Sequence, residues 1–437
     1  MPTLISRRDM LRASAVAAGV WTTHGLLAHA QSQSPNERLN IGIIGVAGRG
    51  GGNMSAVAGE NIVALCDVDE QRLGKAAERF PQAKQYVDWR KLFDQKDLDA
   101  VVVSTTDHTH AFCNVWAMNR DLSVYSEKPL GHSVYEARVV HDKYVAKRDK
   151  IATQMGTQIH ATDNYRRVVE LVQSGAIGPV HEAHAWCGRI GPGGDWPQDE
   201  QPVPAHLHWD LWLGPAPFRP YNSRLMPGNL TWNRYWDYGN GTLGDMGSHV
   251  IDLAFWALKL REPLTCHAKG DPTVAHPVTN PHWMVIEWEH PARGGMPPLK
   301  LTWHDGIQRP PSPDGLDLSK WGLGVLFIGE KGKLVADYGK HILLPEDKFR
   351  DFQRPEPFIP KSLGHHQEWL HACKTGEPTL CNFDYSGKLI EHNLLGNVSY
   401  RVGEKLQWDP KSLKAAGCPK ADEFIQRKYR EGWALDG

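Results

Sequence analysis

Short apolar runs alternate with helical stretches through residues 39–155, and this alternation constrains the fold more than any other feature of the chain. Strands that are apolar throughout and separated by helices are typical of a parallel sheet with both faces covered. We therefore expect residues 38–160 to form a doubly wound α/β domain. The expected strands are 39–45, 62–66, 100–104, 123–125 and 151–155, and the expected helices are 50–58, 70–80, 109–119 and 134–147.

The pattern changes beyond about residue 176, where apolar and polar residues alternate. This period of two predicts a C-terminal α/β domain at residues 161–437, with a large, mostly antiparallel open sheet covered on one face. Residues 188–244, rich in Pro, Gly and Trp, are expected to form loops over a site. Two helical patterns within 364–403 are expected to pack back on the first domain. The expected strands are 180–186, 283–289 and 299–303, with a hairpin at 324–337 that turns at 330–332.

Composition and charge exclude several classes of partner. The 437 residues include 49 Lys plus Arg and 50 Asp plus Glu, a formal net charge of −1. A nearly neutral chain lacks the electrostatic footprint of a nucleic-acid or membrane-surface protein, so we expect a small-molecule partner. The 17 Trp and 22 His residues suit stacking on sugar faces.

No metal site is predicted. The seven cysteines contain no Cys-x-x-Cys pair. The histidine clusters, His206 with His208 and His365 with His366, have no carboxylate or Cys partner at ligand spacing.

The first thirty residues resemble a twin-arginine (Tat) export signal. Arg7 and Arg8 precede a weakly apolar stretch at 13–21, and a small-x-small sequence follows at 28–30. We expect residues 1–30 to be cleaved off, residues 31–37 to be a linker, and the Tat translocase to export the protein to the periplasm. The alternative is an amphipathic helix with a chance Arg pair. The mature chain has no run of 18 apolar residues, so we expect no membrane span.

A glycine-rich turn lies between the first expected strand and helix. Glycines here permit a tight turn and bring a helix N-terminus close to the pyrophosphate of a dinucleotide. Asp67, which ends the second strand, is expected to bind a ribose hydroxyl. Because no Arg or Lys directly follows Asp67, we expect NAD rather than NADP. The alternative is an ordinary turn in which Asp67 caps a helix. The motif residues are Gly45, Ala47 in place of the middle glycine, Gly48, Arg49 and Gly50.

The second motif is Glu127, Lys128 and Pro129, directly after the strand expected at 123–125. This position lies at the carboxyl edge of the sheet, where doubly wound folds bind ligands. A half-desolvated Lys128 with a lowered pKa would donate a hydrogen bond to a reacting oxygen beside the cofactor. The alternative is a surface Lys before a turn Pro.

The third motif places Asp245, His249 and Asp252 within a sector of about 60° on one helix face. Oxidation of an alcohol requires a base to take the hydroxyl proton, and a histidine held by a carboxylate suits that role. His249 is therefore the expected base. Alternatively, Asp245 is an N-cap and His249 an ordinary buried histidine.

These three motifs, in this order and at these separations, resemble the Gfo/Idh/MocA family of oxidoreductases. The resemblance covers nearly the whole mature chain and extends to Thr105, Thr106, His110, 175–178 and 394–398. It implies an NAD-binding Rossmann domain followed by an α/β domain whose open sheet often serves in oligomer contacts. We therefore expect a homo-oligomer, either a dimer or a tetramer.

The resemblance also implies roles for single residues. Lys128 would polarise the substrate hydroxyl, and Asp245 with His249 would be the catalytic pair. The chain departs from the family at Ala47 and at Asp107, which stands where many members have Pro after Thr106. Residues expected to contact the cofactor also include Thr105, Thr106, His110 and Glu127; those expected to contact substrate are Trp232, Arg234, Tyr235, Trp236, Tyr238 and Asp252.

The combined expectation is an exported oxidoreductase that transfers hydride between a sugar, polyol or glycoside hydroxyl and a tightly bound NAD. One alternative is a redox-neutral glycoside hydrolase, in which a transient oxidation permits elimination and the hydride then returns. A second alternative is a non-catalytic sugar-binding protein. For each of the aromatic residues before the glycine loop, packing beneath that loop is the competing interpretation.

Overall fold

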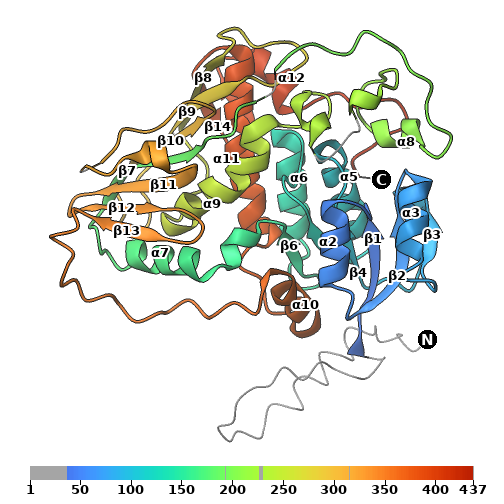
Figure 1. Cartoon of the computed structure of the whole chain (residues 1–437), viewed down its shortest axis with the longest axis horizontal. Helices are drawn as coiled ribbons and strands as arrows, with labels where there is room; N and C mark the ends of the chain where they lie inside the picture. The colour runs from blue at the N-terminus through green and yellow to red at the C-terminus, as the bar shows by residue number, and fades with distance from the viewer. Residues whose placement is uncertain (1–36, 192, 226–229, 314, 437) are drawn as a thin grey trace, which may run out of the picture.

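The computed structural model describes residues 37–191, 193–225, 230–313 and 315–436. The expected Tat signal at 1–30 and almost all of the expected linker lie outside these ranges. The described residues form two sheets with a long helix, α11 (Phe383–Val402), between them (Figure 1). Of the described helices, none has the length and apolar character that a membrane crossing requires.

The first sheet has six parallel strands in the order β3-β2-β1-β4-β5-β6. All residues of β1, β4, β5 and β6 are buried, because helices cover both faces. The predicted doubly wound fold is thereby confirmed. The strands are β1 (Asn40–Ile44), β2 (Asn61–Cys66), β3 (Lys84–Tyr86), β4 (Ala100–Val103), β5 (Ser123–Ser126) and β6 (Thr153–Met155), and the helices are α2 (Arg49–Ala56), α3 (Glu70–Ala77), α4 (Trp89–Leu92), α5 (Asp107–Asn119) and α6 (Val134–Val145).

The sequence analysis missed strand β3. This strand has three residues, two of them exposed, and it pairs only with β2 at the sheet edge. A short polar edge strand carries no apolar run, so hydrophobic periodicity cannot reveal it.

The second sheet has nine strands in the order β13-β12-β11-β7-β10-β9-β8-β14-β15. Its strands pair antiparallel except for β7 with β10, which confirms the predicted, mostly antiparallel sheet. The predicted hairpin is the β11–β12 pair. The strands are β7 (Val180–Cys187), β8 (Thr265–Asp271), β9 (Trp283–His290), β10 (Leu299–Asp305), β11 (Leu323–Gly329), β12 (Lys333–Ala336), β13 (His341–Leu344), β14 (Leu406–Asp409) and β15 (Lys414–Ala416).

Helices join the two sheets into one body. Helix α11 packs against α6 on one side and β8 on the other. Arg138 of α6 makes two hydrogen bonds, of 2.8 and 2.7 Å, to the Glu391 carboxylate of α11. Helix α10 (His365–Thr375) also contacts the first domain, since Lys374 pairs with Glu60 at 2.6 Å. The C-terminal helices therefore pack on the first domain.

The segment between β7 and α9 (Ser248–Ala257) covers the carboxyl edge of the parallel sheet. The His208 N–H donates to the Val68 carbonyl at 2.9 Å, and the Glu70 N–H donates to the His206 carbonyl, also at 2.9 Å. This segment contains α8 (Trp209–Leu213), η3 (Ser223–Leu225), η4 (Thr231–Arg234) and the π-helix η5 (Leu243–Gly247). The remaining elements are η2 (Gln158–Ala161), α7 (Asp163–Gln173), η6 (Leu318–Lys320), η7 (Pro419–Ala421) and α12 (Asp422–Ile425).

Candidate active site

A cavity of about 390 Å³ lies at the carboxyl ends of the parallel strands. Its size is typical of a small-molecule site, and its place is where doubly wound folds bind ligands. Its walls come from the turn after β1, the loops after β2, β4 and β5, the segment before η5, and α9. Segments far apart in the sequence thus contribute to one site.

The glycine-rich turn forms a tight cradle at one end of the cavity. Gly45 has a φ of +87°, and a Cβ there would collide with the Ser104 carbonyl oxygen. A Cβ on Gly50 would collide with the Gly45 carbonyl oxygen, so both positions require glycine. Gly45, Ala47 and Arg49 line the cavity, whereas Gly48 and Gly50 shape the turn without lining it.

Asp67 also lines the cavity, directly after β2. Its carboxylate accepts from the Val46 N–H at 3.1 Å and from the Asp69 N–H at 3.0 Å. Burial raises the pKa of Asp67. The cap of α3 is Asp69, not Asp67, so the alternative interpretation of Asp67 as a helix cap is wrong. The glycine cradle and this carboxylate fit a dinucleotide: the turn would hold the pyrophosphate and Asp67 a ribose hydroxyl.

The sequence analysis missed a cation at this end of the cavity. Arg72, from the first turns of α3, lines the cavity together with Asp67. Its Nε lies 3.3 Å from a carboxylate oxygen of Asp69. The expectation of NAD rests on the residues directly after Asp67, whereas the helix brings Arg72, five residues further on, back to the same end of the cavity.

Thr105, Thr106 and His110 also line the cavity, at the end of β4 and the start of α5. The His110 Nδ1 lies 2.7 Å from the Pro129 carbonyl oxygen, and its Nε2 lies 3.0 Å from that of Thr105. His110 therefore ties the β4 loop to the β5 loop. Burial lowers the pKa of this imidazole.

Lys128 lines the cavity after β5 and forms an ion pair with Asp245. Its neighbour Glu127 accepts hydrogen bonds from Arg49 at 2.8 Å and from Asn53 at 2.9 Å. The expected lowering of the Lys128 pKa is wrong. Burial acts in that direction, but the carboxylates of Asp245 and Glu127 outweigh it, so the pKa of Lys128 is raised. Lys128 is therefore an ammonium group that donates hydrogen bonds.

Asp245 and His249 lie on successive turns of the η5–α9 segment and both line the cavity. Asp245 pairs with Arg189 as well as Lys128, and although burial opposes ionisation, these cations hold its pKa below the ordinary value. Burial and the charge of Lys128 lower the pKa of His249 to about 4. Its Nδ1 is buried without a hydrogen-bond partner among the described residues. His249 is therefore a neutral imidazole that can accept a proton.

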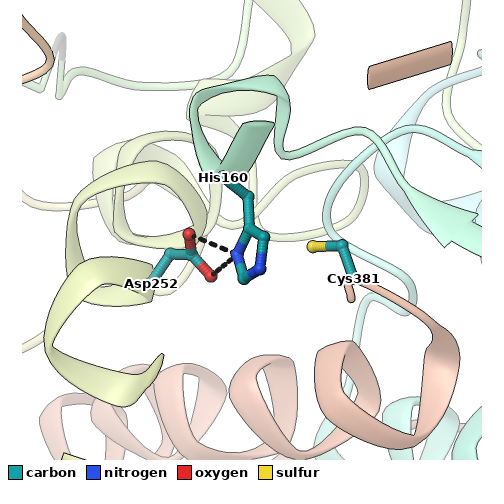
Figure 2. Close-up of side chains that lie close together, drawn as sticks. All are labelled: His160, Asp252 and Cys381. Carbon is teal, nitrogen blue, oxygen red and sulfur yellow. Dashed lines mark hydrogen bonds and ion pairs between the residues drawn. The ribbon is translucent and has the colours of Figure 1, made fainter. Parts of the chain in front are cut away.

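Asp252 does not line the cavity, although the helical wheel placed it on the same face. It is fully buried, and its carboxylate lies 3.0 Å from the Nδ1 of His160 and accepts from the Tyr385 hydroxyl at 2.7 Å. Although burial opposes it, the Asp252 carboxylate raises the pKa of His160 to about 10. Cys381 lies on the other side of the His160 ring (Figure 2).

This buried group is best described as an ion pair. The donor atoms of His160, Asp252 and Cys381 lie within 4.8 Å of one another, close enough to hold a metal ion. However, Figure 2 shows the Asp252 carboxylate and the Cys381 sulfur on different sides of the imidazole, so they do not converge on one point. The His160–Asp252 pair instead fixes α9 from behind the cavity.

The residues expected to bind substrate separate into two groups. Trp232 lines the cavity, but Arg234, Tyr235, Trp236 and Tyr238 do not. Tyr235 and Tyr238 are buried in an apolar cluster beneath the loop, and Trp236 donates through Nε1 to the His276 carbonyl oxygen. Cavity residues that the sequence analysis did not assign to the site include Trp89, Asp107, Gln158, Leu211, Trp212 and Leu230; of these six, Gln158 and Asp107 carried a signal, as polar residues following a strand.

The fold and cavity together define a two-domain protein with a dinucleotide-binding domain. Residues 39–155 match the NAD-binding Rossmann fold of the Gfo/Idh/MocA oxidoreductase family, and residues 177–292 match its C-terminal α/β domain. Together these matches cover more than half of the chain. The protein belongs to this family, and its first domain is an NAD-binding Rossmann domain.

Two curated relatives illustrate the range of the family. An inositol 2-dehydrogenase of Salmonella paratyphi B is 29% identical over 155 residues, which are 33% of this chain and 46% of that protein. A glycosyl hydrolase family 109 protein of Porphyromonas gingivalis is 36% identical over 112 residues, 23% of this chain and 24% of that protein. The chain thus matches less than half the length of these two relatives.

Two solved structures share the fold. GenD2 from gentamicin A biosynthesis, in complex with NAD, aligns with a TM-score of 0.60 at 17% identity over 88% of this chain and 100% of that one. Levoglucosan dehydrogenase, in complex with NADH and levoglucosan, aligns with a TM-score of 0.57 at 16% identity, over 84% and 99% of the two chains.

The glycine cradle generates a first prediction. Gly50→Ala should destabilise the protein by about 1–3 kcal/mol, because the new Cβ overlaps the Gly45 carbonyl and the turn must shift. Gly52→Ala is the matched control: it lies in the same helix with no atom near its Cβ, and should stabilise by about 0.5–1 kcal/mol. Urea unfolding of both variants measures the difference, and equal midpoints would contradict it.

The buried ion pair generates a second prediction. Asp252→Asn should reduce the free energy of unfolding by about 3–5 kcal/mol near pH 6, because it removes the carboxylate partner of a buried imidazolium, which must then lose its proton or remain charged and unpaired. The folded pKa of about 10 exceeds the ordinary 6.5. The pair's contribution is therefore fully present below pH 6.5 and is lost as the pH rises through 10.

The Asp252→Asn variant should lack the loss of stability that the wild type shows as the pH rises toward 10. Denaturant titrations from pH 6 to 10, the range the His160 pKa sets, provide the measurement. Asp142→Asn, at a largely exposed carboxylate, is the control. Parallel stability curves for wild type and Asp252→Asn would refute the assignment.

Proposed function

We propose that this protein transfers hydride between a hydroxyl-bearing carbon of a sugar, polyol or glycoside and a tightly bound NAD. The observation that carries the proposal is the meeting of Lys128, Asp245 and His249 in the cavity that the glycine cradle also lines. Their charge states differ: an ammonium, a carboxylate and a neutral imidazole. A single hydroxyl can thus meet both a hydrogen-bond donor and a proton acceptor.

Each group has a distinct role in this proposal. Lys128 donates a hydrogen bond to the substrate oxygen and stabilises negative charge that develops there. His249 takes the hydroxyl proton, and Asp245 stabilises the imidazolium that forms. The nicotinamide of a bound NAD would supply the acceptor or donor of the hydride. Glu127 and Arg49 pair beside Lys128 and keep the loop that carries it in place.

The preference for NAD over NADP is also a proposal. Asp67 would repel a 2′-phosphate and accept a hydrogen bond from a 2′-hydroxyl. Arg72 is the opposing feature, but its guanidinium already faces the Asp69 carboxylate. Because Arg72 is already paired with Asp69, the carboxylate of Asp67 decides the preference, which is for NAD over NADP.

A redox-neutral glycoside hydrolase is the second candidate. The Porphyromonas gingivalis relative is named a glycosyl hydrolase, and its similarity to this chain motivates the comparison. Mass spectrometry of the products from a glycoside panel would separate the two, since hydrolysis releases a free aglycone and net oxidation leaves a keto sugar. A non-catalytic sugar-binding protein is the third candidate; the intact Lys128, Asp245 and His249 argue against it.

Export and a bound cofactor are linked proposals. The periplasm offers no pool of free NAD, and the Tat route carries folded proteins. A protein exported this way would need to bind its NAD first and keep it. The overall reaction would then return the cofactor to its starting state, by paired oxidation and reduction, by internal return of the hydride or by an external acceptor. The proposed homo-oligomer rests on the family resemblance alone.

Lys128→Ala and His249→Ala should each lower turnover by about 10²–10⁴-fold, because the first removes the donor that stabilises charge on the reacting oxygen and the second removes the proton acceptor. Bound NAD should be retained, since neither side chain forms the glycine cradle. Lys300→Ala, which removes a half-exposed lysine of the second sheet, is the control and should keep full activity. Near-normal turnover in both active-site variants would overturn the assignment.

Protein purified without added nucleotide should contain close to one NAD per chain. Denaturation followed by quantification of the released nucleotide measures this, and activity should not respond to added NAD. Protein that is empty and turns over only with millimolar NAD would point to a plain dehydrogenase with an exchanging cofactor.

Arg7 and Arg8 test the export proposal. Changing both to Lys should leave the unprocessed precursor in the cytoplasm, because the Tat signal depends on the arginine pair. Cell fractionation with immunoblotting follows the precursor. Unaltered processing near Ala30 would exclude this route.

A further inference from the structure

Asp107 lies in the cavity but has no part in the proposed chemistry. It is the first residue of α5, and it lines the cavity together with Lys128, Asp245 and His249. The residue is 4% exposed, and its Oδ2 is buried without a hydrogen-bond partner among the described residues. A carboxyl oxygen left unpaired in a ligand cavity is a candidate contact for the ligand.

The surroundings of Asp107 favour its neutral form. Burial is the largest effect and raises the pKa, and the nearby carboxylate of Asp245 adds to it. Lys128 and the amide groups of Asn240 act in the opposite direction. The neighbouring His110 on the same helix is buried with a lowered pKa and adds no compensating charge. The resulting pKa of Asp107 is about 8, so this carboxyl carries a proton at neutral pH.

A neutral carboxylic acid donates a hydrogen bond, which a carboxylate cannot do. The reacting hydroxyl already has a donor in Lys128 and a proton acceptor in His249. A further donor in the same cavity therefore suits a different oxygen of the same ligand. Asp107 and Asp245 both lie close enough to Lys128 to influence its pKa. The ligand oxygen bound by Asp107 would therefore be close to the hydroxyl oxygen that Lys128 contacts.

We propose that Asp107 is a specificity-determining residue that donates a hydrogen bond to the substrate oxygen next to the hydroxyl handled by Lys128 and His249. The inference rests on the proposed function and narrows its substrate class to rings with adjacent oxygens, such as sugars and cyclic polyols. An isolated alcohol would leave the Asp107 donor unpaired and would react poorly.

The protonation state is tested without any substrate. The infrared spectrum of the purified NAD-loaded protein at neutral pH should contain a protonated-carboxyl band that Asp107→Asn lacks. The difference between the two spectra isolates Asp107 from other carboxyls, such as that of Asp305 in β10, which is also buried. The band should disappear as the pH rises past about 8. Identical spectra at neutral pH would show that Asp107 is ionised and would overturn the proposal.

The proposed hydrogen bond is tested by removing the substrate oxygen and the Asp107 carboxyl in turn. Single-turnover reduction of the bound nicotinamide is followed with myo-inositol, levoglucosan and the monodeoxy analogues of each. Removal of the neighbouring oxygen should slow the wild type by about 10- to 100-fold. In Asp107→Ala the same removal should have almost no further effect. Asp107→Asn, which keeps a neutral donor, should retain most of the wild-type rate, and Asp142→Asn is the surface control.

The outcomes separate this inference from the proposed function. Reduction of the nicotinamide with an equal deoxy penalty in wild type and Asp107→Ala, or with no penalty in either, would overturn the role of Asp107 alone. If none of the compounds reduces the nicotinamide in any variant, the hydride-transfer proposal fails for these sugars and the substrate role of Asp107 fails with it. The infrared band would then report only its protonation state.

Discussion

The ion pair between Lys128 and Asp245 is the contact on which the rest of the site depends. Lys128 follows the fifth strand of the parallel sheet, and Asp245 lies in the π-helical turn before α9, which packs on the second sheet. One interaction therefore joins the domain that holds the cofactor to the domain that completes the cavity. It also sets the charges of its two partners, because it raises the pKa of Lys128 and lowers that of Asp245. The pKa of His249 is lowered mainly by burial, to which the charge of Lys128 adds.

Buried contacts of α9 and α11 support the ion pair between Lys128 and Asp245. The buried His160–Asp252 pair holds α9 to the turn after β6, and the Tyr385 hydroxyl connects the same carboxylate to α11. Helix α11 is in turn bound to α6 through Arg138 and Glu391. Proton-transfer groups need rigid placement, and a helix held by buried, directional contacts provides it. Asp252 thus supports the position of α9, although it is not among the residues that line this cavity.

The sequence predicted the residues of the dinucleotide-binding turn better than the residues of the substrate region. Gly45, Gly50 and Asp67 could be placed because their roles follow from local geometry: a strand, a turn and the end of the next strand. Tyr235 and Tyr238 could not be assigned correctly, since an aromatic residue near a loop can face a ligand or an apolar cluster equally well. Arg72 was missed because a helical turn brings it back to the cavity. Asp107 directly follows Thr106, but its charged neighbours there, Lys128 and Asp245, come from distant segments of the chain.

By itself the sequence determined the alternation of the main strands and helices in the first domain, the parallel and antiparallel halves of the fold, and the candidate residues Lys128, Asp245 and His249. These depend on periodicity and on motifs that are short in sequence. Only the tertiary structure decided their chemical states. Lys128 was expected to have a lowered pKa, but a carboxylate 117 residues away reverses the effect of burial. The helical wheel places Asp252 on the same face as His249, yet in the folded protein Asp252 faces His160 and Tyr385, because it lies almost one turn further along α9, where η2 and α11 pack against the helix. Charge and orientation are properties of the whole environment of a group, which no local pattern encodes.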